Sequence, residues 1–346
     1  MKFAVVITVY KRYNYIHEAI RSALEQSLKP VQVIVVADDI SKLKDVQGVT
    51  LVEVNHPYHG KVISEGAKAV HDDVDAIAFL EDDDLFHRDK LKILSKIINE
   101  SKTGIILVHN FQKFIDAEGK EAGGYIVNHL TRNQPRSSVI VTRDNVVNVA
   151  RLYPAIHHNL SSMTVRKEFL EKIRDKLANF WSALDFAIFY LAIEHGKVLH
   201  VPDSLTYYRI GSGETTQFYS SKDFNDHLQK RLCVLKKYLQ TFRMLITFLE
   251  NCRQCKALVE RELLFDEIFV ALLDGRFNCG LPEPISASTY EIAILNFKSL
   301  LSRQISLSTF LKTFLAIGGL YVLGKKRVSD MYVKYLYRLE SRNSIH

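Results

Sequence analysis

Four consecutive acidic residues follow directly on an apolar run in the first third of the chain. Residues 76–80 are AIAFL and residues 81–84 are EDDD. Adjacent carboxylates repel one another, and a cluster of them at the end of a buried segment is costly unless a cation neutralises it. Carboxylate oxygens suit a hard divalent ion such as Mg²⁺ or Mn²⁺, which commonly bridges substrate phosphates. The cluster predicts a divalent-metal site; the alternative is a solvated acidic turn before the helix expected from about residue 87.

The apolar run before this cluster has the length and composition of a strand buried on both faces. Similar runs predict strands at residues 3–9, 31–36 and 49–54, with helices at about 14–24 and 60–71 between them. Strands that alternate with helices across short links are typical of a parallel sheet. Ligands of such sheets bind beyond the carboxyl ends of the strands, where the acidic cluster would lie.

Polar residues also follow the other predicted strands. Thr8 and Tyr10 end the first strand, and Asp38 and Asp39 follow the second. Since parallel strands share one carboxyl edge, these residues and the acidic cluster predict a nucleotide-type pocket. The sequence contains neither G-x-G-x-x-G nor G-x-x-x-x-G-K-S/T, so a dinucleotide site and a P-loop are not indicated. The alternatives are plain strand-end residues and a turn or helix cap at Asp38 and Asp39.

The rest of the chain divides into a mixed segment and a helical segment. Residues 116–149 are the least periodic part, with several glycines and a proline, and we expect loops and short strands there. Further helices are predicted at about 88–100, 167–177 and 182–196, and further strands at 104–109, 161–165, 198–202 and 205–209. Long helices are predicted at about 224–250, 254–273 and 289–301. The pattern indicates an α/β domain followed by a helical region.

The net charge of +7 on 346 residues is unevenly placed. Residues 298–346 hold nine Lys/Arg and two Asp/Glu, so the preceding residues balance to zero. Neither a nucleic-acid-binding motif nor stacking aromatics accompany this charge, so no nucleic-acid partner is expected. No signal peptide is evident at the N-terminus. The four cysteines lack the spacing of a zinc site, and we expect reduced thiols and a cytoplasmic protein.

The basic region includes an apolar segment. Residues 305–323 are ISLSTFLKTFLAIGGLYVL, followed by GKKR. Lys312 and the pair Gly318–Gly319 make this segment marginal for a helix that spans a bilayer. Two alternatives remain: a helix on an anionic membrane surface, peripheral at the inner face of the cell membrane, and a helix packed on the protein itself or on a second copy.

Five segments in order resemble the inverting glycosyltransferases of family 2, which have the GT-A fold. The segments are VITVYKR at 6–12, VVADDIS at 35–41, FLEDDD at 79–84, LD at 184–185 and VPDSLTYYR at 201–209. The resemblance covers about residues 3–215. It implies a Rossmann-like, mostly parallel α/β sheet flanked by helices, with a nucleotide-sugar half at about 1–110 and an acceptor half at about 111–215. Residues 216–346 would form a helical C-terminal extension.

The resemblance implies roles for nine residues. Asp185 corresponds to the general base and Asp83 to the metal ligand. Contacts to the nucleotide sugar are implied for Thr8, Tyr10, Asp38, Lys61, Glu81, Asp82 and Arg209. Asp38 would accept a hydrogen bond from the base, which favours UDP and leaves GDP open. The alternatives are that Asp185 is only a first-turn acid of its helix, and that Arg209 pairs with a carboxylate.

The implied activity is inverting, metal-dependent transfer of a sugar from a nucleotide-sugar donor to a hydroxyl acceptor, with Mn²⁺ or Mg²⁺ as cofactor. The acceptor would be a glycan or a lipid-linked glycan, and a homo-oligomer remains open. A second function stays open: a non-catalytic nucleotide- or glycan-binding module in a membrane-attached assembly. A third, a nucleotidyltransferase, would be expected to show a glycine-rich opening loop where this chain has VYKRY at 9–13.

Overall fold

The computed structural model describes residues 1–101, 104–212, 224–273, 276–281, 288–301, 305–323 and 325–343. The chain forms two compact units, one of residues 1–213 and 248–255 and the other of residues 214–247 and 256–346. The boundary expected at residues 215–216 lies outside the described residues.

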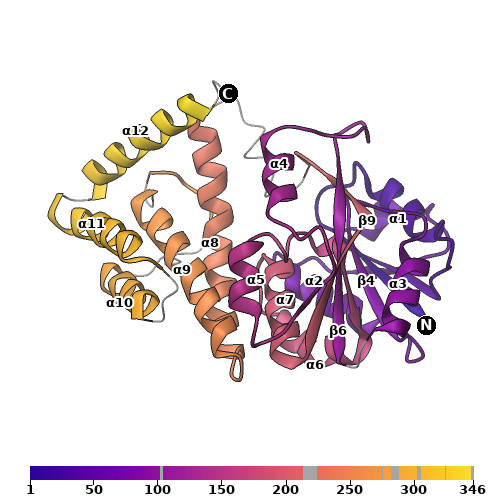
Figure 1. Ribbon diagram of the computed structural model, residues 1–346. Helices are drawn as coiled ribbons and strands as arrows, with labels where there is room; N and C mark the ends of the chain where they lie inside the picture. The colour runs from indigo at the N-terminus through magenta and orange to yellow at the C-terminus, as the bar shows by residue number, and fades with distance from the viewer. Residues whose placement is uncertain are drawn as a thin grey trace. The chain divides into compact units, whose positions relative to one another are not determined.

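The first unit is built on a mixed sheet, which has nine strands within the described residues (Figure 1). Its order is β3-β2-β1-β4-β8-β6-β9-β5, and β7 pairs with β9. The strands are β1 Phe3–Val9, β2 Gln32–Ala37, β3 Thr50–Glu53, β4 Ala76–Glu81, β5 Leu85–Phe86, β6 Ile105–Ile115, β7 Val139–Val141, β8 Met163–Arg166 and β9 Lys197–Arg209. This mixed α/β arrangement, flanked by helices, confirms the expected fold class.

Strands β1 to β4 form the parallel half, and every residue of β1 and β2 is buried. Their register aligns the carboxyl ends, because Thr8 lies opposite Glu81 and Val9 lies opposite Ala37. The polar residues that follow these strands are therefore brought to one edge, as the sequence predicts.

Helices cover the sheet on two faces (Figure 1). One side chain set of β1, including Phe3, Val5 and Ile7, packs in the same core as α1 and α3. The opposite set meets α2, where a Cβ on Gly66 would lie 2.9 Å from the side chain of Val6. The helices of this unit are α1 Ile16–Leu24, α2 His59–Lys68, α3 Lys90–Glu100, α4 Tyr125–Arg132, α5 Val146–Leu152, α6 Lys167–Leu177 and α7 Leu184–His195.

The segment expected as the acceptor half, at about residues 111–215, differs from expectation in two places. Helices α4 and α5 lie in or across the segment expected to hold loops and short strands. Helix α4 buries none of its residues and α5 has only seven residues. Neither therefore has the long repeating pattern of buried apolar residues from which a helix is predicted. The strands expected at 198–202 and 205–209 are one strand, β9. Its pairing with β6 shifts register between Asn110 and Phe111, and this bulge accommodates Pro202.

The second unit is helical in its described residues (Figure 1). Its helices are α8 Phe224–Phe248, α9 Arg253–Leu273, α10 Thr289–Leu301, α11 Leu307–Leu323 and α12 Lys325–Asn343. A small core joins Leu264, Ile292, Ile305 and Ile317 from α9, α10, α11 and the link before α11. Over the part of the chain that is described, none of the helices combines the length and the apolar character needed to cross a bilayer.

The expectation of reduced thiols is wrong, because the four cysteines form two disulfides. Cys233 pairs with Cys279 and Cys252 with Cys255, with Cα atoms 5.3 and 5.2 Å apart, the separation that a disulfide requires. Sequence spacing alone does not show the first pair, whose members are 46 residues apart. The cytoplasmic expectation rested partly on reduced thiols and loses that support.

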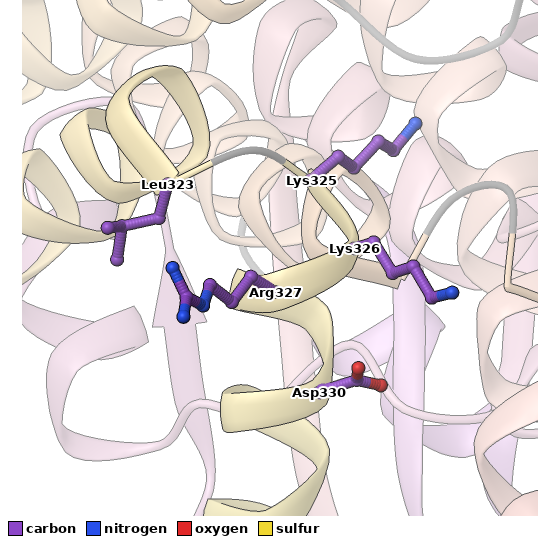
Figure 2. Close-up of a pocket in the computed structure, with 5 residues that line it drawn as sticks. All are labelled: Leu323, Lys325, Lys326, Arg327 and Asp330. Carbon is purple, nitrogen blue, oxygen red and sulfur yellow. The ribbon is translucent and has the colours of Figure 1, made fainter.

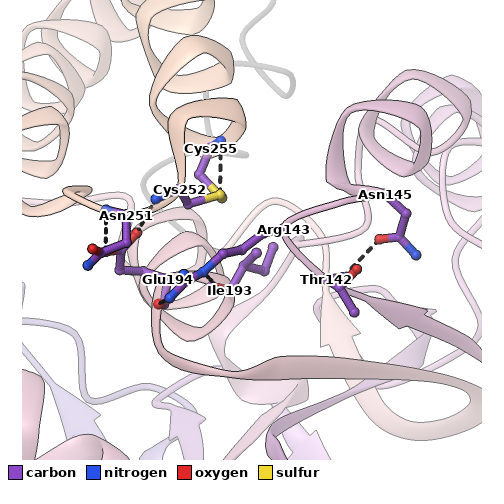
Figure 3. Close-up of a disulfide and its surroundings, with 8 residues drawn as sticks. All are labelled: Thr142, Arg143, Asn145, Ile193, Glu194, Asn251, Cys252 and Cys255. Carbon is purple, nitrogen blue, oxygen red and sulfur yellow. Dashed lines mark hydrogen bonds between the residues drawn. A yellow bond between two sulfur atoms is a disulfide. The ribbon is translucent and has the colours of Figure 1, made fainter.

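The second disulfide lies where the chain returns to the first unit. The buried carboxylate of Glu194 accepts hydrogen bonds from the backbone N–H groups of Asn251 and Cys252, both at 2.8 Å (Figure 3). The Arg143 guanidinium donates to the backbone carbonyl of Glu194. The Glu194 carboxylate thus supplies acceptors to two backbone N–H groups just before α9, which have no acceptor within that helix.

Candidate active site

The acidic cluster lies at the carboxyl end of β4 and is largely buried. Asp82, Asp83 and Asp84 are 4%, 7% and 0% exposed. Burial raises the pKa of Asp82 to about 8, and the Asp83 charge adds to this effect. Burial and the Asp83 charge also raise the pKa of Asp84 to about 7. Burial therefore favours the neutral, protonated form of both carboxyl groups, and a cation bound beside them would favour the ionised form.

Arg12 is the cation that this structure places on the cluster. Its Nη2 lies 2.7 Å from Oδ1 of Asp82, and its Nη1 lies 3.3 Å from Oδ2 of Asp83. Nη1 also donates to the carbonyl of Ser212 at 2.6 Å. Lys11, the residue before it, has a φ of 61°, which turns the chain as it leaves β1. Sequence reasoning did not assign Arg12, and its place in the opening motif VYKR was the available signal.

Asp84 connects the cluster to two residues far along the chain. Its Oδ2 accepts a hydrogen bond from Nδ2 of Asn159 at 2.9 Å, and its Oδ1 accepts one from the backbone N–H of Arg209 at 3.0 Å. Beneath it, the buried Lys90 ammonium donates to the carbonyl of Ser161. Burial lowers the pKa of Lys90 well below its usual range, opposed by the Asp84 charge. Lys90 is a further buried polar residue that the sequence pattern did not reveal.

The chemistry of the cluster fits a divalent ion that substrate completes. Mg²⁺ is typically held by one or two carboxylates together with phosphate oxygens and water. The described residues contain no preformed group of three or more His, Cys, Asp or Glu side chains arranged around a metal. The carboxylates of Asp83 and Asp82 are therefore the groups that could hold such an ion, and Arg12 contacts both of them.

Asp38 and Tyr13 meet beyond the carboxyl ends of β1 and β2. Oδ1 of Asp38 accepts hydrogen bonds from the Tyr13 hydroxyl at 2.7 Å and from the backbone N–H of Lys11 at 2.9 Å. Burial and the hydrogen bond to Asp38 raise the pKa of Tyr13. Asp39 instead caps the short 3₁₀ helix at Ile40–Leu43 by accepting from the N–H of Ser41. The two adjacent aspartates thus have different local partners.

Thr8 and Tyr10 lie at the end of β1 as expected. The Thr8 hydroxyl is 3.1 Å from Nε2 of His59, the first residue of α2. Desolvation of the ring and the nearby Arg12 charge lower the pKa of His59 to about 4, so this imidazole is neutral. The Lys61 ammonium, in the same helix, pairs with Glu65 at 2.7 Å.

The position of His59 is fixed by a close contact between two links. The backbone N–H of His59 donates to the carbonyl of Trp181 at 3.0 Å, and that of Gly60 donates to Phe180 at 3.1 Å. A Cβ at Gly60 would lie 1.8 Å from the carbonyl oxygen of Leu177, so a side chain there would force the helices apart.

Asp185 lies in the first turn of α7 and is held toward the cluster. Its Oδ2 accepts a hydrogen bond from the backbone N–H of Asn159 at 3.0 Å. Burial raises the pKa of Glu81 well above its usual range, and the charges of Asp84, Asp83 and Asp185 raise it further. Asp185 is therefore close enough to the acidic cluster for its charge to act on Glu81.

Asn159 joins these two groups. It bonds to Asp84 through its side chain and to Asp185 through its backbone, and its φ is 77°, which is uncommon for a residue other than glycine. Its Oδ1 is buried and has no partner within the described residues. No sequence signal identified Asn159, because it lies 75 residues from Asp84 along the chain.

Arg209 is buried and uses its guanidinium within the protein. Nε donates to the carbonyl of Asp83 at 2.9 Å, Nη1 to the carbonyl of Asp116 at 2.9 Å, and Nη2 to the carboxylate of Glu18 at 2.9 Å. Its side chain is 1% exposed. Arg209 therefore contacts the backbone of the acidic cluster at Asp83, and its ion pair is with the carboxylate of Glu18.

Comparisons with known proteins bear on the family and the fold of the chain. Residues 4–174 match the model of the family "Glycosyl transferase family 2". An uncharacterized glycosyltransferase of Rickettsia felis is 30% identical over 125 residues, which are 34% of this chain and 20% of that protein. An uncharacterized glycosyltransferase of Nostoc sp. is 25% identical over 222 residues, covering 61% of this chain and 65% of its own. The matched part of this chain thus spans about a fifth of the Rickettsia relative.

Solved structures share the fold at low sequence identity. The structure of Staphylococcus aureus TarS residues 1–349 in complex with UDP superposes with a TM-score of 0.55 at 14% identity, covering 96% of this chain and 92% of that one. The structure of the same fragment without a named ligand gives 0.52 at 16% identity, covering 80% and 74%. The chain has the GT-A fold, and through residues 4–174 it belongs to glycosyl transferase family 2.

Proposed function

We propose that this chain is an inverting glycosyltransferase that moves a sugar from a nucleotide-sugar donor to a hydroxyl acceptor. One observation carries the proposal. Asn159 ties Asp185 to Asp84, so a carboxylate that forms no ion pair within the described residues lies beside the acidic edge of the sheet. A base next to a phosphate-binding edge is the arrangement that sugar transfer from a nucleoside diphosphate requires.

The donor is assigned to the carboxyl edge of β1, β2 and β4. Thr8 and Tyr10 line the nucleoside pocket, and Asp38 accepts a hydrogen bond from the base, with UDP favoured. The complex of S. aureus TarS with UDP supports a uridine nucleotide in this fold. Glu81 and Asp82 lie at the ribose and phosphate end, and Lys61 reaches the phosphates from α2.

Arg209 is assigned a positioning role in place of the expected diphosphate contact. Its guanidinium donates to the carbonyls of Asp83 and Asp116 and to the carboxylate of Glu18, and its side chain is 1% exposed. It therefore acts by fixing the acidic cluster.

A divalent cation, Mn²⁺ or Mg²⁺, bound at Asp83 would neutralise the charge that develops on the departing nucleoside diphosphate. Arg12 already supplies one positive charge to the same carboxylate. The proposed divalent ion and Arg12 would thus be two sources of positive charge near the leaving group, and both would use the carboxylate oxygens of Asp83.

Asp185 removes the proton from the acceptor hydroxyl as that oxygen attacks the anomeric carbon. The new carbon–oxygen bond forms as the bond to the diphosphate breaks, and the electron pair leaves with the diphosphate. A single displacement inverts the anomeric centre and needs no covalent nucleophile. Base catalysis by a positioned carboxylate typically contributes about 10²- to 10⁴-fold in rate.

The acceptor is assigned to the glycan class, free or lipid-linked, with the protein peripheral at the cytoplasmic face of a membrane.

The second candidate function is a nucleotide- or glycan-binding module without catalysis. The neutralisation of Asp82 and Asp83 by Arg12 is the observation that favours it, because a site that needs no metal can bind without reacting.

The test uses slow hydrolysis of UDP-sugars to UDP, which needs no known acceptor. Asp185→Asn should lower the rate of UDP release at least a hundredfold while the Kd for UDP changes less than threefold. Asp175→Asn, an exposed carboxylate in α6, is the matched control and should leave both values unchanged. A variant that keeps hydrolysis contradicts the base assignment. Wild-type protein that binds UDP but releases none from any UDP-sugar supports the binding module.

A further inference from the structure

Helices α10 and α11 turn large apolar side chains outward. Ten such residues are between 39% and 78% exposed. They form what we call the apolar face: Tyr290, Ile294, Phe297 and Leu301 in α10, and Leu307, Leu311, Phe314, Leu315, Val322 and Leu323 in α11. The two helices pack on each other, so their outward residues belong to one part of the second unit (Figure 1).

The spacing of these residues makes each set a stripe. Those of α10 recur at intervals of four, three and four residues, and those of α11 follow the same rule over its first two turns. Such spacing places side chains on one side of a helix. The apolar face is therefore a built surface and not scattered single residues.

The inner side of the same helix pair is partly polar. The Thr313 hydroxyl donates to Oδ1 of Asn296 at 2.7 Å, and both residues are buried. Nδ2 of Asn296 donates to the carbonyl of Phe310 at 3.3 Å. A polar contact thus joins the two helices on their inner side, beside the apolar core of Ile292 and Ile317, while the residues of the apolar face point outward. Packing within the unit does not account for the apolar face.

Positive charge accompanies the apolar face. Lys298 and Lys312 are exposed on α10 and α11 themselves. The exposed residues Lys325, Lys326 and Arg327, which begin two positions after Leu323, line a surface pocket of about 380 Å³ (Figure 2).

Few acids oppose this charge in the described residues from 288 to 336. Glu291 accepts hydrogen bonds from Ser288, and Asp330, which also lines the pocket, pairs with Arg276 at 2.6 Å. The surface therefore keeps a net positive charge beside its apolar residues.

We propose that the apolar face and the Lys325–Arg327 cluster dock on a bilayer that exposes anionic headgroups. The apolar side chains enter the boundary between headgroups and acyl chains, and the cations contact lipid phosphates. Tyr290 places an amphipathic ring at the edge of the stripe, as tyrosines do at membrane surfaces. The inference names the partner surface of the proposed function and in that respect rests on it.

Charge decides between a membrane and a second copy. A two-fold dimer through the apolar face would bring Lys298, Lys312 and their copies to one interface, where like charges repel. An anionic bilayer offers the opposite charge over a large area. The lipid surface is therefore the occupant that both parts of the surface fit.

The experiment is co-sedimentation of the full chain with phosphatidylcholine vesicles that contain 0 or about 30% phosphatidylglycerol. Wild type should bind the anionic vesicles and bind the neutral ones at least tenfold more weakly. Phe314→Ser with Leu315→Ser, and separately Lys326→Glu with Arg327→Glu, should each lower the partition coefficient about tenfold or more. Leu152→Ser and Lys92→Glu with Lys96→Glu, at exposed positions of the first unit, are the matched controls. Circular dichroism checks that each variant is folded.

Three results would overturn the proposal. Wild type that pellets with neither kind of vesicle has no lipid surface. Equal loss in the control variants shows non-specific adsorption. A dimer that Phe314→Ser with Leu315→Ser converts to a monomer, without any vesicle binding by wild type, assigns the face to a second copy. UDP release in solution should be unchanged in all these variants, so failure of lipid binding and failure of sugar transfer are told apart.

Discussion

Arg12 sets the charge of the acidic cluster before any ligand binds. Its guanidinium contacts Asp82 at 2.7 Å and Asp83 at 3.3 Å, and both carboxylates are nearly buried. A carboxylate oxygen that accepts a charge-assisted hydrogen bond is less available to a metal ion. Arg12 therefore contacts the cluster in the absence of metal and would compete with a divalent ion for Asp83.

Removal of this competitor should make nucleotide binding more dependent on metal. We expect Arg12→Gln to raise the ratio of UDP affinity in Mn²⁺ to that in EDTA about tenfold, because a hydrogen bond between charged groups is worth roughly 1.5–3 kcal/mol. Isothermal titration calorimetry under both conditions measures the ratio. Arg21→Gln, on the exposed side of α1, is the control. An unchanged ratio in Arg12→Gln would show that Arg12 and the metal do not share Asp83.

At the scale of elements, the sequence predicts the parallel half of the sheet well. Continuous apolar runs such as residues 3–9 and 76–80 form β1 and β4, since burial on both faces demands that composition. It does not predict what joins the elements. Asn159 reaches Asp84 across 75 residues and Arg12 reaches Asp82 across 70, and no local pattern encodes such contacts.

The Cys233–Cys279 disulfide and the inner polar pairs escape prediction for the same reason, because the distance in space between residues far apart in sequence follows from the whole fold. The two cysteines are 46 positions apart in the sequence. Site residues that end predicted strands, such as Thr8 and Asp38, could be placed at the correct edge, while their partners His59 and Tyr13 could not.

A buried histidine pair links β6 and β9. Nδ1 of His109 lies 2.9 Å from Nδ1 of His200, and each Nε2 contacts a backbone carbonyl. The neutral pair has two N–H groups for these three contacts, so a third proton would satisfy all of them. Burial opposes that charge and lowers the pKa of His200 to about 4, and the cost of a buried charge exceeds the gain from one hydrogen bond.

This pair should make the fold sensitive to acid. The folded pKa of about 4 lies below the ordinary value of 6.5, so between these values the unfolded chain binds a proton that the folded chain does not. Stability is full above pH 6.5 and is lost as the pH falls toward 4. Between pH 7.5 and 5, His200→Gln should lose about 2 kcal/mol less free energy of unfolding than wild type, because each step in pKa corresponds to about 1.4 kcal/mol.

Urea unfolding at the two pH values measures this difference, and His17→Gln, an exposed histidine of α1, is the control. If wild type and His200→Gln lose equal stability on acidification, the pair holds its third proton in the folded protein. That result would reverse the assigned direction of the pKa shift.

The candidate active site and the apolar face belong to different units of the chain. The first holds the candidate active site, and the second holds the apolar face and its cations. Residues 248–255 return to the first unit at the junction of α8 and α9, where the Glu194 carboxylate accepts hydrogen bonds from the backbone N–H groups of Asn251 and Cys252. Ligands of the site should therefore stabilise the first unit, and lipid should act on the second.

Trp181 is the chain's single tryptophan and reports on the first unit alone. Its carbonyl accepts the N–H of His59, and its ring lies 5.2 Å from that of Tyr58, close to the proposed donor site. UDP with Mn²⁺ at a hundred times Kd should stabilise this unit by about 2.7 kcal/mol. The midpoint of thermal unfolding followed by Trp181 fluorescence should then rise by roughly 5–10 °C.

Asp83→Asn separates the two parts of that shift. The variant should keep the rise in midpoint that UDP produces in EDTA, because Asp38, the proposed partner of the base, is unchanged. It should lose the additional rise that Mn²⁺ gives to wild type, because Asp83 is the proposed metal ligand. Asp144→Asn serves as the matched control for a lost carboxylate. An equal shift with Mn²⁺ and with EDTA in wild type would leave Arg12 as the cation that serves the diphosphate, and the metal would have no part in nucleotide binding.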